Sequence, residues 1–133
     1  MILDKQHAMS EAQAVTASAA STNIIDLTKA GDAQEELYLY IHVDGEAATA
    51  DGAATVTFAL QTDDNSGFSS ATTMWSSAAI GKATLVDKYV VFKGRIPQGC
   101  EQYLRVYYTV ATGPLTAGKF SAYLVKDVQT NNM

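Results

Sequence analysis

The sequence has few of the residues on which catalysis and covalent cross-linking depend. It contains one cysteine, Cys100, and two histidines, His7 and His42, among 133 residues. A lone cysteine excludes an internal disulfide and a multi-cysteine zinc site. Neither histidine lies in a catalytic or metal-binding motif, and no nucleophile elbow or phosphate-binding glycine loop occurs. We therefore expect no enzymatic activity, no catalytic residue, no metal site and no cofactor.

Charged residues are also scarce, at 17% of the chain, and the net charge is −5. The clusters of Lys and Arg that bind phosphate backbones are missing, and the negative charge disfavours anionic membranes. No apolar run is long enough to span a bilayer, and the N-terminal segment lacks the apolar core of a signal peptide. We expect no nucleic-acid partner, no membrane partner and no export by that route.

Hydrophobic residues make up 47% of the chain, and they recur with the period of two that is typical of β-strands. The alternation predicts eight strands, at about residues 12–18, 22–27, 36–43, 53–62, 72–79 and 87–94, and on either side of Gly113-Pro114 within residues 101–127. Residues 1–11 are predicted to form an arm or a short helix. We expect a single all-β domain over residues 1–133, folded as an antiparallel two-sheet jelly-roll sandwich.

The same alternation separates core positions from outward ones. Inward-facing side chains are predicted at Leu37, Leu39, Ile41, Val43, Ala54, Val56, Phe58, Leu60, Leu104, Val106, Tyr108 and Val110. Most of the tyrosines fall on the opposite faces, which in a lone sandwich would meet water.

Outward tyrosines have two explanations. Tyrosine favours strands and tolerates water at its hydroxyl, so a solvated sheet face is the simpler one. Tyr and Arg are also enriched in protein interfaces, where Lys and Glu are depleted. We favour the second and predict interface residues at Tyr38, Tyr40, His42, Tyr103, Arg105, Tyr107 and Tyr123.

One loop keeps a different function open. Asp63, Asp64, Asn65 and Gly67 resemble a Ca²⁺-binding loop, and Trp75 is an aromatic residue on which a sugar would stack. The alternative is therefore a carbohydrate- or receptor-binding jelly-roll module. Asp and Asn are also ordinary turn residues, and the spacing lacks the distant bidentate Glu of a twelve-residue Ca²⁺ loop. We favour a turn over an ion site.

Several segments, taken in order, carry a family resemblance. They are "MILD" at the start, "AQAVTASAASTNIIDL", "LYLYIHVD", "FALQTDDNSGFSS", "PQGCEQYLRVYYTV" and "LTAGKFSAYLVKDVQ". Together they cover nearly the entire chain, and each is a strand with its turn. The chain resembles the small capsid cement, or decoration, proteins of short-tailed phages, typified by the cement protein of the Bordetella bacteriophage. It departs from that pattern at Cys100 and in the "GEAATAD" loop.

The resemblance implies a virion structural protein, and it would place the alternative, a carbohydrate- or receptor-binding jelly-roll module, on the virion as well. Such a structural protein sits on the outer surface of an icosahedral capsid, after a period in the host cytoplasm, and stabilises contacts between major capsid subunits. Its implied partners are the major capsid protein and further copies of itself, as a homodimer or homotrimer. The family has no known enzymatic activity or cofactor, which agrees with the residue inventory.

Overall fold

The structure is a computed structural model that describes residues 5–28 and 37–126. Within them, a single 3-10 turn, η1 (Lys5–His7), precedes ten strands. The strands are β1 (Ala8–Ala14), β2 (Ala19–Ala20), β3 (Ile25–Asp26), β4 (Tyr38–Val43), β5 (Thr55–Asp63), β6 (Thr72–Ser76), β7 (Ile80–Gly81), β8 (Val90–Arg95), β9 (Tyr103–Ala111) and β10 (Lys119–Val125). No helix in the described ranges is long and apolar enough to cross a membrane.

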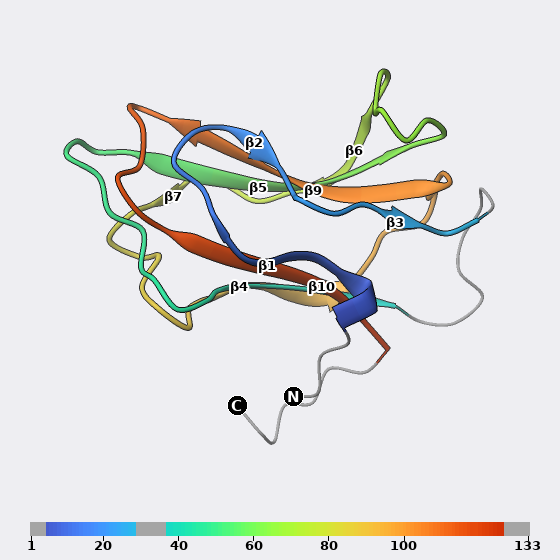
Figure 1. Ribbon diagram of the computed structural model, residues 1–133, viewed down its shortest axis with the longest axis horizontal. Helices are drawn as coiled ribbons and strands as arrows, with labels where there is room; N and C mark the ends of the chain where they lie inside the picture. Colours follow the sequence, from blue (N-terminus) through green and yellow to red (C-terminus); the bar gives the residue numbers. More distant parts are fainter. Residues whose placement is uncertain (1–4, 29–36, 127–133) are drawn as a thin grey trace.

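The strands form two antiparallel sheets that lie one above the other (Figure 1). The four-stranded sheet has the order β1-β10-β4-β8. The six-stranded sheet has the order β2-β9-β5-β6, with β3 also pairing with β9 and β7 with β5. If β2 with β3 and β6 with β7 are each counted as one interrupted strand, this is the strand order of a double-sheet jelly roll. The predicted all-β jelly-roll sandwich is confirmed.

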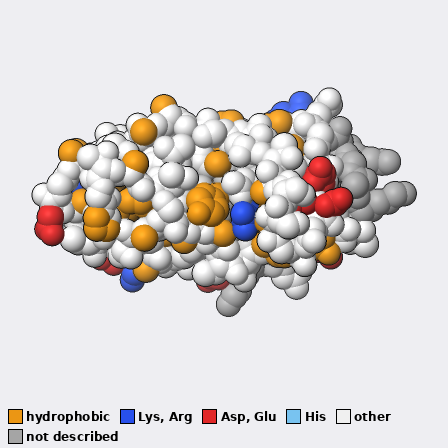
Figure 2. All heavy atoms as spheres, turned by 90° about the horizontal axis from the view of Figure 1, so that it is seen from above, with side chains coloured by type: hydrophobic (Ala, Val, Ile, Leu, Met, Phe, Trp, Pro, Cys, Tyr) orange, Lys and Arg blue, Asp and Glu red, His pale blue; other side chains and the backbone are white. Residues whose placement is uncertain are grey.

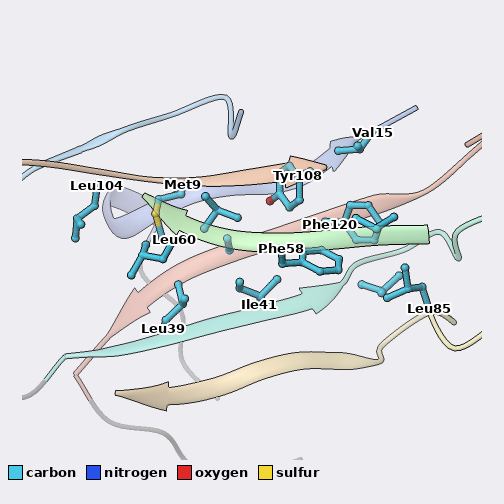
Figure 3. Packing of buried hydrophobic residues seen from close by; sticks show 14 of the residues in the cluster. Met9, Val15, Leu39, Ile41, Phe58, Leu60, Leu85, Leu104, Tyr108 and Phe120 are labelled. Atoms are coloured by element: carbon cyan, nitrogen blue, oxygen red, sulfur yellow. The ribbon is translucent and has the colours of Figure 1, made fainter. Parts of the chain in front are cut away.

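Aromatic rings from both sheets meet at the centre of the core (Figure 3). Phe58 of β5 makes edge-to-face contacts with Tyr108 of β9, at 5.6 Å between ring centroids, and with Phe120 of β10, at 5.2 Å. The predicted inward residues of β4, β5 and β9 are buried, with only Leu37 and Val110 half-buried at the margin. Period-two alternation therefore located the core face of these strands correctly.

The prediction for the N-terminal segment was wrong for residues 8–11. These residues belong to β1 rather than to an arm or helix, and β1 ends at Ala14 instead of continuing to Ser18. Residues 5–7 do form a short 3-10 helix, and residues 1–4 lie outside the described ranges. Two register irregularities, between Ala8 and Ser10 and between Ser10 and Gln13, interrupt the pairing of β1 with β10. Each irregularity shifts the side-chain alternation, so the period of two that marks a strand is absent from the sequence.

Candidate interaction faces

The predicted interface residues occupy two separate outer faces of the sandwich. Tyr40 and Tyr123 pair across β4 and β10, which places them with Tyr38 and His42 on the four-stranded sheet. Tyr103, Arg105 and Tyr107 lie on β9 of the six-stranded sheet, opposite Asp63, Gln61 and Ala59 of β5. The seven residues thus do not form one patch, because the core separates the two groups.

On the four-stranded sheet, three rings lie in a stack. The centroids of Tyr40 and His42 are 4.9 Å apart, and those of His42 and Tyr123 are 6.3 Å apart. Burial raises the pKa values of both Tyr40 and Tyr123, so both phenols are neutral at physiological pH. The stack presents aromatic surface on this face, next to Lys93 and Arg95 of β8, which lie opposite Tyr40 and Tyr38 of β4.

Tyr123 is more buried than the sequence predicts. Only 7% of its surface is exposed, because it packs in a small apolar cluster with Ala8 of β1 and Val125 of β10. Strand β10 lies between β1 and β4, so its outward side chains are flanked by neighbours on both sides. The prediction that Tyr123 stands on an open outer face therefore needs correction, whereas Tyr38 and Tyr40 are half-buried at the margin of the same cluster.

A chain of hydrogen bonds fixes the strands beneath this face. The buried Ser121 hydroxyl accepts from the Ala12 N–H at 2.8 Å and donates to Asp44 Oδ2 at 2.7 Å. Ala12 has a positive φ of 47°, which is unusual for a residue with a side chain. Ser121 therefore holds an irregular part of β1 against β10 and orients the carboxylate beside His42.

His42 makes the four-stranded face sensitive to pH. Its Nε2 lies 3.8 Å from Asp44 Oδ2, while its Nδ1 is buried and forms no hydrogen bond with the described residues. Burial lowers the pKa of His42 from its ordinary 6.5, against the attraction of Asp44 and Asp87. The unfolded chain therefore binds this proton more readily than the folded protein. The stability that depends on neutral His42 is present above pH 6.5 and is lost as the pH falls below it.

We expect the free energy of unfolding to fall more between about pH 7.5 and about pH 5.5 in the wild-type protein than in His42→Gln, which has no titratable group at position 42. Urea denaturation at the two pH values measures the difference. His7→Gln is the matched control, because His7 is exposed, and it should keep the wild-type loss. Parallel losses in wild type and His42→Gln would show that another group is responsible.

On the six-stranded sheet, Arg105 is the centre of the outward row. Its guanidinium carbon lies 4.2 Å from the centroid of the Phe68 ring and 5.5 Å from that of Tyr107. Its Nε donates a hydrogen bond of 2.8 Å to Gln61 Oε1. Neither Phe68 nor Gln61 could be assigned to this site from the sequence, because Phe68 comes from the loop after β5 and Gln61 resembles any polar strand residue.

The acidic loop after β5 is held by its own backbone. Asp63 Oδ2 accepts from the Ser70 N–H at 2.9 Å, and this bond is the main cause that lowers the pKa of Asp63. Asn65 Oδ1 accepts from the Gly67 N–H at 2.7 Å, as in an Asx turn. Ligand oxygens of Asp63, Asp64 and Glu101 lie within 4.8 Å of one another, a spacing that would suit a cation. The Asp63 carboxylate, however, already accepts hydrogen bonds from the loop, which supports the turn interpretation.

Trp75 serves in packing. It pairs with the buried Leu60 across β5 and β6, and its ring lies 4.2 Å from that of Phe92 on β8, centroid to centroid. The contact joins the edge strands of the two sheets, β6 and β8, and closes that side of the sandwich. Much of the indole surface that a sugar would need is thus occupied by Phe92.

The fold and its two faces define a class of protein, a double-sheet jelly roll whose outer faces carry aromatic residues. Residues 9–124 match the model of the Bbp16 family, and the chain belongs to this family. The family name indicates a Bordetella phage protein, so the chain is phage-related. No curated protein matches the chain.

Proposed function

We propose that the protein is a capsid cement protein, which binds the outside of an icosahedral phage head and stabilises contacts between major capsid subunits. The observation that carries the proposal is the pair of outer faces, in a protein of a phage-related family. Each face places half-buried tyrosines at its middle, and the six-stranded one adds a stacked arginine. Aromatic residues and Arg are enriched in protein interfaces, because they bury large areas with few unpaired charges.

Cementing follows from binding the assembled lattice in preference to free subunits. A ligand that binds only one state stabilises that state by mass action, by about 2.7 kcal/mol per site when its free concentration is a hundred times Kd. A homodimer or homotrimer that touches several capsid subunits gains a high effective concentration for each later contact. Modest individual interfaces are then sufficient, which suits faces without dense charge.

The charge of the chain suits an outer location. A net charge of −5 gives little attraction to packaged DNA, and clustered Lys and Arg are missing from the sequence. The protein would assemble from the host cytoplasm onto finished or maturing heads, with the major capsid protein and other copies of itself as partners.

Sedimentation with undecorated heads tests the proposal. Purified protein is mixed with heads that lack it and, in parallel, with unassembled capsid subunits. We expect saturable co-sedimentation with heads, at a fixed number of copies per capsid subunit, and little association with free subunits. Equal binding to both, or none to heads, would contradict a role in cementing the lattice.

A further inference from the structure

The outer face of the six-stranded sheet has a single cation at its middle. On β9 the outward row is Tyr103, Arg105 and Tyr107, and the neighbouring outward residues of β5 from Thr55 to Gln61 carry no charge. Figure 2 looks onto this face and shows mostly uncharged and hydrophobic atoms there, with acidic groups near the ends of the molecule. One positive group surrounded by neutral surface has the composition of an interface core with a charged anchor.

The Arg105 side chain is held in place, but its terminal nitrogen donors lack hydrogen-bond acceptors among the described residues. The Phe68 and Tyr107 rings lie against the guanidinium, and Gln61 accepts from its Nε. Within residues 5–28 and 37–126, its two Nη groups form no hydrogen bond or ion pair. The guanidinium is therefore fixed in orientation while its terminal donors point to no acceptor of the described chain.

The loop that supplies Phe68 is built to hold the ring there. Phe68 is only 7% exposed and adopts a positive φ of 52°, a strained conformation for an aromatic residue. Its N–H donates to the Asn65 carbonyl at 2.9 Å, and Asp63 anchors Ser70 two residues further on. Much of the entropy of ordering a long arginine side chain is thus lost on folding rather than on binding, which strengthens any contact made later.

The chemistry of the face selects its occupant. A guanidinium with free terminal donors matches a carboxylate in a bidentate pair. A nucleic acid would need several cations, whereas Arg105 is the one charged residue in the outward row of β9. A second copy placed on a twofold axis over Arg105 would bring two guanidiniums together. A different protein that presents an Asp or Glu side chain fits best.

We propose that the outer face of the six-stranded sheet docks on a different protein, and that a carboxylate of that protein pairs with the Nη groups of Arg105. The inference rests on the proposed function, under which that protein is the assembled capsid. It adds the face that meets the capsid and the chemistry that recognises it. The four-stranded face would then make contacts other than this one.

Binding of variants to undecorated heads tests this assignment. Arg105→Gln removes the charge but keeps a polar side chain of similar reach, and it should weaken binding on the order of 30-fold, as for an interface hot spot. Arg105→Lys keeps the charge but lacks the planar guanidinium that can donate two parallel hydrogen bonds, and it should recover only part of the affinity. Lys93→Gln makes the same change of charge on β8 of the four-stranded sheet, and it should stay within about twofold of wild type.

Melting temperatures of the variants check that each is folded. If Arg105→Gln binds heads as tightly as the wild type does, the assignment of this face is wrong, while the proposed cement function still stands. Heads that fail to bind the wild type would overturn both. If Arg105→Gln instead reduced self-association in sedimentation velocity and spared head binding, the occupant would be a second copy and the inference would be wrong.

Discussion

Phe58→Ala is expected to destabilise the protein by about 3–5 kcal/mol, the usual cost of deleting a buried aromatic ring. Phe58 is fully buried and contacts Tyr108 within its own sheet and Phe120 in the opposite one. Its loss would open a cavity where the two sheets meet and would also leave two edge-to-face contacts unmade. The melting temperature should fall by roughly 10–20 °C in a domain of this size.

Thr57→Ala is the matched control for Phe58→Ala. Thr57 is the preceding residue of β5 and faces outward opposite Thr109, so its replacement should cost about 1 kcal/mol or less. Calorimetry or urea denaturation measures both variants. Similar losses in the two would contradict the packing described for the core.

Tyr123→Ser is expected to lower folding stability, whereas Tyr107→Ser is expected to weaken binding to heads. Tyr123 lies in the cluster with Ala8 and Val125, and its removal should cost roughly 1.5–3 kcal/mol of unfolding free energy. Tyr107 is half-buried on the six-stranded face against Arg105, so its removal should cost about 1 kcal/mol or less. Binding to heads, corrected for the folded fraction, should fall on the order of tenfold for Tyr107→Ser only.

Comparing the two tyrosines separates folding from recognition. Each variant deletes the same atoms from an outward position of a strand, so the chemistry of the change is matched. A large loss of stability in Tyr107→Ser would make that residue part of the core. A loss of head binding by fully folded Tyr123→Ser would move the capsid contact to the four-stranded face.

The sequence predicts strands well where a single face is buried along their whole length. In β4 and β9, inward Leu, Ile and Val alternate with outward Tyr, Arg and His, and the structure buries the apolar set. The alternation is visible because the register with neighbouring strands is continuous over most of their length. The two-sheet fold class follows from several such strands in one short chain.

Strand β1 could not be predicted by the same rule. Met9 faces the core, but so does the polar Ser10, which accepts a hydrogen bond of 2.7 Å from the buried Tyr108 hydroxyl. That bond is a tertiary contact between residues far apart in the sequence. Local periodicity in the sequence shows neither the irregular register of β1 nor that a serine can be buried at position 10.

The sequence predicted which side chains lie on the outer faces, but it did not predict the contacts that these side chains make. Alternation correctly placed Tyr103, Arg105 and Tyr107 on one side of β9. The contact between Arg105 and Phe68 depends on how the loop after β5 folds back, which Asp63 and Asn65 determine through backbone hydrogen bonds. Likewise, the burial of Tyr123 follows from the central position of β10, which is a property of strand order.

The most direct measurement is the temperature at which DNA-filled heads release their DNA, followed with a dye while purified protein is added back to undecorated heads. A cement protein should raise this temperature in a saturable manner, with half-saturation at the concentration that half-fills its sites. It should do so with wild-type protein and not with Arg105→Gln at the same concentration. A release temperature that stays constant while the protein visibly coats the heads would contradict the account.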